Sequence, residues 1–406
     1  MTKSPLFIGI MSGTSLDGID VVLATFELGA CQVVATHFLT YEPNSKLALL
    51  ALHTPSENEL ERSILLGNDL AVLYAQAVNT LLAKASIVPS EVIAIGCHGQ
   101  TIRHKPRYKD NIGYTVQIGN ASLLAELTGI SVVSDFRSRD IAAGGQGAPL
   151  VPAFHQAIFA NANINRAIIN IGGIANITYL GSAGLGTVGL GITSQELNDG
   201  EILGFDSGPG NMLLDAWVKA NLGKDYDAEG AWSSTGVVLQ PLLTSMLAEP
   251  YFALPPPKST GRDLFDDAWL AKHLQAQDFR SPSSSSPDSR SPDSRSPDPR
   301  PQDIARTLVA LTAHTIVDVL MRYCNAVDEI YLCGGGARNS LLVADIQALL
   351  IGKKLATTDE LGIGVDWLEA LAFAWLAKQT IHNKPSNLPS VTGAKGLRVL
   401  GAIYPV

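Results

Sequence analysis

The amino-acid sequence predicts a two-domain α/β protein with a ligand-binding cleft. Two strand–turn–strand segments, one around Gly13 and one around Gly172, lie about half a chain apart. A third segment near the end has a strand, the turn Gly334-Gly335-Gly336 and a helix. A chain of 406 residues, 46% of them hydrophobic, is also long enough to bury two cores.

The first hairpin, residues 8–23, has apolar strand-forming residues on both sides of small turn residues. Backbone N–H groups and hydroxyls of the turn 12–15 form a set of donors suited to phosphate oxygens. The carboxylates of Asp17 and Asp20 could hold a cation or orient water beside such a phosphate. The alternative is a glycine-rich hairpin that only reverses the chain, because a glycine motif is weak evidence by itself.

Two later loops strengthen the functional interpretation. Residues 168–178 repeat the pattern of strand, glycine turn and strand, with Asn176 as a polar member. Residues 329–340 predict a strand, a triple-glycine turn and the start of a helix. The sequence contains neither a Walker-type loop nor a dinucleotide glycine fingerprint, so the two commonest nucleotide-binding folds lose support.

Predicted strands and helices alternate through the first half of the chain. Residues 31–40 are predicted to form a third strand beside the first hairpin, and the apolar spacing over 57–85 predicts one helix or two. The other predicted elements are strands at 92–97, 114–120 and 130–134, helices from 46, at 121–128 and at 150–160, and a glycine-rich active-site loop at 142–149.

Candidate substrate ligands follow two of these strands. His98 and Gln100 come directly after the apolar strand 92–97, at the edge where α/β sheets bind ligands, although a lone histidine is more often structural. Arg137 is the better candidate for binding a substrate carboxylate, because a guanidinium makes two parallel hydrogen bonds with that group. Arg139 fits a salt-bridged surface turn equally well.

In the second half, residues 202–211 are predicted to carry the chemistry. Asp206 lies on a glycine-rich turn before a helix that begins near Met212, and its carboxylate could act as a general base or as a turn residue. Glu369 stands in a helix predicted at 366–377 in otherwise apolar company, where it could join a structural network or bind sugar hydroxyls. The basic turn 258–262 has no assigned role.

Composition and sequence bias restrict the class of protein. The net charge of -9 argues against a nucleic-acid binder. The four cysteines form no CxxC pair, and we expect no signal peptide and no membrane helix, which together predict a cytoplasmic protein. Residues 280–301 repeat a Ser/Pro/Asp/Arg pattern and are predicted to be a surface insertion with little effect on catalysis.

The order of the three glycine loops resembles the actin, hexokinase and heat-shock chaperone superfamily, in which two hairpins grip the phosphates and the third loop holds adenosine. Within it, five motifs look like those of the anhydro-N-acetylmuramic acid kinases. They are Met11–Gly18, Gly96–Thr101, Gly144–Pro152, Phe205–Asn211 and Lys258–Arg262. The resemblance runs from Ile8 to Tyr404 apart from the insertion.

The resemblance implies a two-domain actin-like ATPase (RNase H-like) fold with a central cleft for ATP and substrate. The expected domains are residues 1–160, completed by 378–406, and residues 161–377 with the insertion. The expected ATP-binding residues are Gly13, Thr14, Ser15, Leu16, Asp17, Gly18, Ile19, Asp20, Gly172, Gly173, Asn176, Gly334, Gly335, Gly336 and Asn339. The expected sugar ligands are His98, Gln100, Arg137 and Glu369.

The resemblance also implies a reaction. Asp206 matches the family's catalytic aspartate, which would activate water to open the anhydro ring of 1,6-anhydro-N-acetylmuramic acid while ATP phosphorylates the freed 6-oxygen. The products would be N-acetylmuramic acid 6-phosphate and ADP, as in peptidoglycan recycling. Mg²⁺ is expected with ATP, its ligands unassigned, and a homodimer is possible. The rival hypotheses are a kinase for another sugar and an ATP-driven conformational protein that needs a protein partner.

Overall fold

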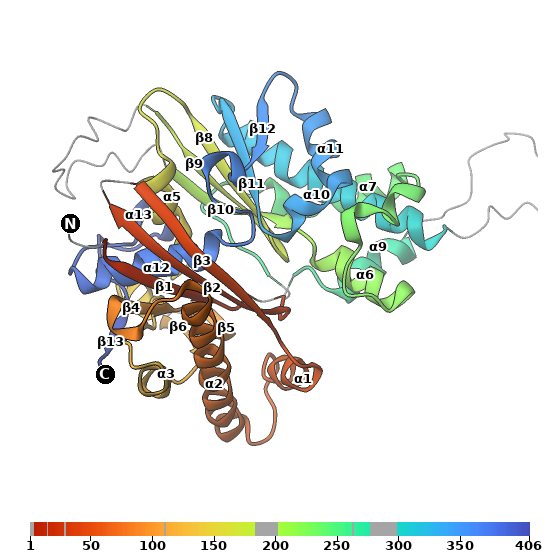
Figure 1. Ribbon diagram of the computed structural model, residues 1–406. Helices are drawn as coiled ribbons and strands as arrows, with labels where there is room; N and C mark the ends of the chain where they lie inside the picture. The colour runs from red at the N-terminus through yellow and green to blue at the C-terminus, as the bar shows by residue number, and fades with distance from the viewer. Residues whose placement is uncertain are drawn as a thin grey trace, which may run out of the picture.

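The protein is built around two mixed β-sheets that lie side by side, each with its own helices (Figure 1). The computed structural model describes residues 4–13, 15–27, 30–108, 111–182, 202–261, 264–276 and 299–406. The predicted ATP ligand Thr14 lies outside the described residues, as do residues 280–298 of the predicted insertion.

The first sheet has the strand order β13-β7-β4-β1-β2-β3. Its strands β1, β2 and β3 form an antiparallel meander, β4 is parallel to β1, β7 is parallel to β4, and β13 is antiparallel to β7. These strands are β1 (Leu6–Met11), β2 (Gly18–Glu27), β3 (Ala30–Thr40), β4 (Val92–Cys97), β7 (Val132–Ser134) and β13 (Ala402–Tyr404). The accompanying helices are α1 (Pro43–Ala51), α2 (Glu59–Ala85), α3 (Ala121–Thr128) and α4 (Ser138–Ala142). The apolar run predicted at 57–85 is therefore one helix.

A two-stranded hairpin lies apart from this sheet. Strand β5 (Gln100–Tyr108) pairs antiparallel with β6 (Asn111–Ile118). The sequence predicted a strand near β6 but none at β5, because β5 carries charged side chains and a proline instead of an apolar alternation.

The second sheet has the order β10-β9-β8-β11-β12. Its strands are β8 (Arg166–Ile171), β9 (Ile174–Leu180), β10 (Ile202–Pro209), β11 (Glu329–Cys333) and β12 (Lys354–Thr357). Its helices are α6 (Met212–Leu222), α7 (Gln240–Leu247), α8 (Pro250–Ala253), α9 (Asp267–Ala276), α10 (Pro301–Tyr323) and α11 (Ser340–Leu349), and α5 (Val151–Phe159) joins the two sheets.

Both sheets follow the same plan. In each, three antiparallel strands are followed by two strands parallel to the first, which gives the order third, second, first, fourth, fifth. This duplicated topology is that of the two-domain actin-like ATPase fold with RNase H-like halves. The predicted fold class is confirmed.

Helix α12 (Leu368–Ile381) packs on the first sheet, against β1, β2 and β4. Gly9 and Gly96 permit this contact: a Cβ at Gly9 would lie 1.8 Å from the Ala370 carbonyl oxygen, and one at Gly96 would lie 2.0 Å from that of Phe373. The chain then passes through α13 (Pro389–Thr392) to β13 in the same sheet. The predicted boundary at residue 377 stays a prediction, and these contacts favour one before α12.

Helix α10 forms the centre of the second core. By length and composition alone it could cross a membrane, but 78% of its most apolar window is buried in the fold. Its hydrophobic residues pack against β9, β10, α6, α7 and α11, which is the role of a core helix.

Candidate functional site

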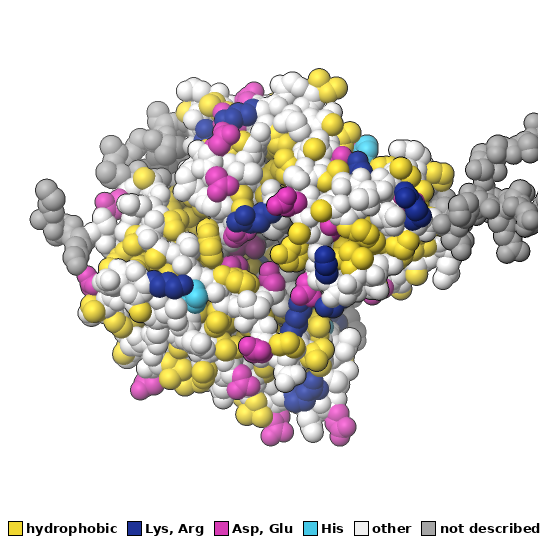
Figure 2. Space-filling model, turned by 45° about the vertical axis from the view of Figure 1, so that its right-hand side comes forward, with side chains coloured by type: hydrophobic (Ala, Val, Ile, Leu, Met, Phe, Trp, Pro, Cys, Tyr) yellow, Lys and Arg dark blue, Asp and Glu magenta, His cyan; other side chains and the backbone are white. Residues whose placement is uncertain are grey.

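Two adjoining cavities lie in the cleft between the sheets and share Ser15, Gly172 and Gly173. The smaller has a volume of about 300 Å³ and the larger about 570 Å³. Figure 2 shows acidic and basic side chains around the hollow on this face of the molecule. The shared residues belong to the two predicted phosphate loops, so one ligand could extend from one cavity into the other.

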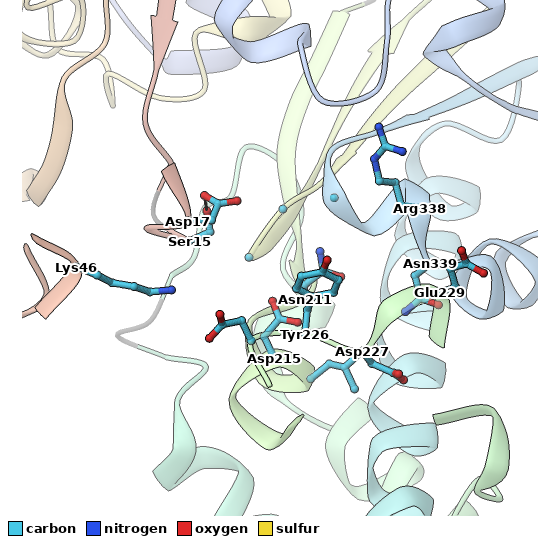
Figure 3. Close-up of a pocket in the computed structure, with 15 residues that line it drawn as sticks. Ser15, Asp17, Lys46, Asn211, Asp215, Tyr226, Asp227, Glu229, Arg338 and Asn339 are labelled. Carbon is cyan, nitrogen blue, oxygen red and sulfur yellow. Dashed lines mark hydrogen bonds between the residues drawn. The ribbon is translucent and has the colours of Figure 1, made fainter. Parts of the chain in front are cut away.

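The smaller cavity is bordered by both halves of the molecule (Figure 3). Lys46 of α1, Ser15 and Asp17 face it from one side. The residues on the other side are Asn211, Asp215, Tyr226, Asp227, Glu229, Arg338 and Asn339. Gly335 of the triple-glycine turn also lines it. The mixture of hydroxyl, carboxylate and amide groups around an aromatic ring suits a nucleoside.

Asn339, a predicted ATP ligand, has a structural task as well. Its Oδ1 accepts a hydrogen bond from the Leu342 N–H at 3.1 Å and thereby caps α11. Asp227 is similarly occupied, because its carboxylate accepts hydrogen bonds from the N–H groups of Trp232 and Ser233. Both side chains therefore shape this end of the cleft as well as line it.

In the first hairpin, the turn brings Gly13, Ser15 and Asp17 to the cleft. The Ser15 hydroxyl donates to Asp17 Oδ1 at 2.7 Å, and Gln100 Nε2 donates to the Gly13 carbonyl oxygen at 3.0 Å. Leu16 has a φ of 57° and its side chain is buried in the core, as is that of Ile19. Because the side chains of Leu16 and Ile19 are buried, these two residues could contact a ligand only through their backbone atoms.

Asp20 is a mostly buried carboxyl near other acidic groups. Burial and the neighbouring charges of Asp17, Glu369 and Asp366 raise the pKa of Asp20 to about 8. Asp20 is therefore protonated at neutral pH unless a nearby cation favours its charged form.

Asp206 lines the larger cavity from inside β10. The sequence predicted it on a turn, but it lies opposite Asn176 of β9, where the strand pairing becomes irregular before Gly208. Its Oδ2 accepts a hydrogen bond from the Thr260 N–H at 3.0 Å, and its own N–H donates to the Lys258 carbonyl oxygen at 3.0 Å. Desolvation raises the pKa of Asp206 to about 7, despite the opposing effects of the Thr260 hydrogen bond and the Lys258 charge. The carboxyl is thus able to exchange a proton near neutral pH.

The same cavity is also lined by His98, Arg137 and Glu369. Arg137 Nε and Nη2 donate to His98 Nε2 at 3.1 and 2.9 Å, and Arg137 Nη1 donates to the Gly147 carbonyl oxygen at 2.8 Å. Burial and the Arg137 charge hold the pKa of His98 well below its usual range, so its imidazole is neutral. Burial raises the pKa of Glu369, and the Arg137 charge opposes that rise. Much of the Arg137 guanidinium is therefore committed to the protein.

The structure brings together at the two cavities Gly13, Ser15, Asp17, His98, Arg137, Gly172, Gly173, Asn176, Asp206, Gly335, Asn339 and Glu369. The remaining described candidates line neither cavity: Leu16, Gly18, Ile19, Asp20, Gln100, Gly334 and Gly336. Asn176 lines the larger cavity, on the side of Asp206, and not the smaller one.

Sequence reasoning missed Lys46, Tyr226 and Thr260. Lys46 and Tyr226 lie in stretches without a glycine motif, and no local pattern predicts which side chains face a cleft. Thr260 was within a recognised motif, but its role depends on contact with a strand 54 residues away.

Comparison with known proteins decides the family. The model of the anhydro-N-acetylmuramic acid kinase family matches residues 5–406. The chain belongs to the anhydro-N-acetylmuramic acid kinase family. As a member of this family, the protein is a kinase that uses ATP.

Relatives named anhydro-N-acetylmuramic acid kinase match nearly the whole chain. The protein of Nitrosospira multiformis is 51% identical over 99% of this chain and 100% of its own length. That of Nitrosomonas europaea is 51% identical over 98% of this chain and 99% of its own length. Among solved structures, the ADPNP-bound activator of 2-hydroxyisocaproyl-CoA dehydratase from Clostridium difficile matches 93% of this chain and 97% of its own, with 14% identity and a TM-score of 0.43.

Proposed function

We propose that the protein phosphorylates 1,6-anhydro-N-acetylmuramic acid with ATP while hydrolysing the anhydro ring, to give N-acetylmuramic acid 6-phosphate and ADP. The observation that carries this proposal is the position of Asp206. A carboxyl with a pKa of about 7 lines a cavity that shares residues of two glycine turns with a second cavity of about 300 Å³. A base and a phosphoryl donor would then act on one sugar from two sides.

Asp206 takes a proton from water, and the water oxygen bonds to the anomeric carbon. The bond between that carbon and the 6-oxygen breaks, and its electron pair stays on the 6-oxygen. This oxygen bonds to the γ-phosphorus of ATP, and the bond from phosphorus to the bridging oxygen breaks to release ADP. Asp206 returns its proton to solvent. Phosphoryl transfer of this kind depends mainly on positioning and charge stabilisation.

The residues around the smaller cavity, with Gly13, Ser15, Gly172 and Gly173 at the junction, would hold ATP with its phosphates directed toward the larger cavity. The N–H groups of the turns suit phosphate oxygens. Lys46 of α1 supplies positive charge from the half of the molecule that contains the first sheet. His98, Arg137 and Glu369 would hold the sugar opposite Asp206, and Gln100 would support the Gly13 turn.

Mg²⁺ would bind beside Asp17 and Asp20. The described residues contain no group of three or more His, Cys, Asp or Glu side chains that could hold a metal ion. Mg²⁺ bound with ATP usually takes only one or two carboxylates together with phosphate oxygens and water, and the exposed carboxylate of Asp17 lines the smaller cavity. The ion would neutralise charge on the phosphates.

Mass spectrometry of the products formed in ¹⁸O-labelled water tests the proposal. Purified protein, ATP, Mg²⁺ and 1,6-anhydro-N-acetylmuramic acid should give a phosphorylated sugar with one ¹⁸O at the anomeric carbon. An untouched sugar with continued ATP hydrolysis would contradict it. Equal phosphorylation of N-acetylglucosamine or a plain hexose would favour the kinase for another sugar, and ATP-driven polymerisation without sugar would favour the conformational protein. The cytoplasmic location, the homodimer and the absence of nucleic-acid and membrane partners stay predictions.

A further inference from the structure

The basic turn that follows Pro257 contacts the strand that carries Asp206. The N–H of Thr260 donates to the Asp206 carboxylate, and the carbonyl oxygen of Lys258 accepts from the Asp206 N–H. The Tyr251 hydroxyl donates to the Asp206 carbonyl oxygen at 2.9 Å. The backbone of the base is therefore held on both sides of its Cα, and the carboxylate is oriented by a main-chain donor.

The hydroxyl of Thr260 has no such structural task. Its Oγ1 is buried and has no hydrogen-bond partner among the described residues. Thr260, Gly261 and Asp206 line the same cavity. A buried hydroxyl without a partner costs stability, so its presence needs an explanation outside the fold.

We infer that the Thr260 hydroxyl, together with Asp206, holds the water that attacks the anomeric carbon. The inference rests on the proposed function. The Thr260 N–H donates a hydrogen bond to Oδ2 of Asp206. The hydroxyl oxygen of the same residue is only three covalent bonds away from that nitrogen, so it also lies near the carboxylate. A water beside the carboxylate can donate one hydrogen to Asp206 and accept from, or donate to, the threonine hydroxyl.

In this arrangement the backbone and the side chain of Thr260 have separate roles. The main-chain N–H orients the base, while the side-chain oxygen orients the nucleophile, and so the two effects are separable by mutation. Replacing Thr260 with valine removes the hydroxyl, keeps nearly the same shape and leaves the N–H in place. Replacing it with serine keeps the hydroxyl.

The test compares the steady-state kinetics of Thr260→Val and Thr260→Ser with those of the wild-type protein. We expect Thr260→Val to lower kcat for the anhydro sugar roughly 10- to 100-fold, with KM for ATP and for the sugar nearly unchanged. Thr260→Ser should recover most of the activity. The acidic limb of the pH profile should stay in place in both variants, because the contact with the Asp206 carboxylate comes from the backbone.

Thr358→Val is a matched control. The Thr358 hydroxyl is also buried without a partner among the described residues, but Thr358 lines neither cavity. Both valine variants should keep or slightly raise the melting temperature, and only Thr260→Val should lose activity. A fall in melting temperature confined to Thr260→Val would give the hydroxyl a structural role and overturn the inference.

Other outcomes would also overturn it. Wild-type kcat in Thr260→Val would exclude a role for the hydroxyl in the reaction. A higher KM for the sugar with unchanged kcat would make it a sugar ligand instead, and a displaced acidic limb would mean that it acts through Asp206. If the wild-type protein leaves the anhydro sugar unmodified, the proposed function fails and the inference falls with it.

Discussion

Strands β3 and β10 occupy equivalent places in the two sheets, as the third strand of each meander. Strand β3 is an edge strand whose side chains are exposed or only partly buried, and none of them lines a cavity. Strand β10 is covered by α5, α8, α10 and α13 and carries Asp206. The same topological position is thus a solvent-facing edge in one half and part of a cavity wall in the other.

The comparison shows that two strands can hold the same place in a duplicated fold and still differ in chemical environment. The helices that cover each strand determine that environment. Asp206 has a raised pKa because the layers over β10 remove water from its carboxyl. The carboxylate of Asp17, on the hairpin of the first sheet, is exposed. Asp17 and Asp206 are therefore two different kinds of carboxyl lining one cleft.

The largest expected effect follows from removing the buried carboxyl of β10. Asp206→Asn keeps an oxygen to accept the Thr260 N–H but cannot take a proton, so kcat should fall roughly 10²- to 10⁴-fold. The labelled-water assay should show loss of the phosphorylated product. Near wild-type turnover would remove Asp206 from the role of base and erase the chemical contrast between the sheets.

The same substitution should change stability in a pH-dependent way. Because the pKa of Asp206 is raised from 3.8 to about 7 on folding, the folded state binds this proton more tightly than the unfolded state and loses stability as the pH rises between those values. Asp206→Asn should therefore unfold at a higher temperature than wild type at pH 8, with an advantage on the order of a few kcal/mol, and should lose that advantage near pH 4. Thermal unfolding at both pH values, without ligand, measures the difference.

A glycine inside the first sheet and a glycine at a turn of the second should tolerate an added methyl group differently. Gly96→Ala would push a Cβ against the backbone of α12, and we expect a loss of about 3 kcal/mol or more in the free energy of unfolding. Gly172→Ala is the comparison variant, in the turn between β8 and β9, where the nearest atom would lie 3.6 Å from the added Cβ. It should change stability by less than about 1 kcal/mol and act mainly by raising KM for ATP. Equal losses of stability in urea unfolding would contradict this contrast.

The smallest expected effect concerns the charge beside Asp206. Lys258 donates to the carbonyl oxygens of Tyr251 and Phe252, and its charge lowers the pKa of Asp206. The ionisable groups identified around this pair are Tyr251 and Arg322, of which Arg322 acts on Lys258. Lys258→Met should move the acidic limb of the kcat/KM profile upward by about one pH unit.

An exposed lysine of α9 provides the control for this substitution. Lys272 lines neither cavity, so Lys272→Met should leave the limb in place. A limb that moves downward in Lys258→Met, or equally in both variants, would show that Lys258 does not act on the base through its charge.

Much of the scaffold could be predicted from local patterns. The hairpins around Gly13 and Gly172, the strand before Gly334 and the helix after Met212 depend on apolar periodicity and glycine turns, which are properties of short stretches. The five motifs and the family follow from the same local information. Strand β5 was not predicted because its charged side chains do not form the alternation of hydrophobic and polar residues that indicates a strand.

What only the tertiary structure decided is how these stretches meet. It placed Thr260 against Asp206, committed Arg137 to His98 and Gly147, gave Asn339 a capping role, and set α12 on the first sheet. The sequence determined which residue types and turns were present; the burial, hydrogen bonding and charge around them depend on residues far away in the chain. The pKa of a carboxyl depends on those surroundings. The sequence therefore identified Asp206 as a candidate base, but its pKa of about 7 could be seen only in the folded structure.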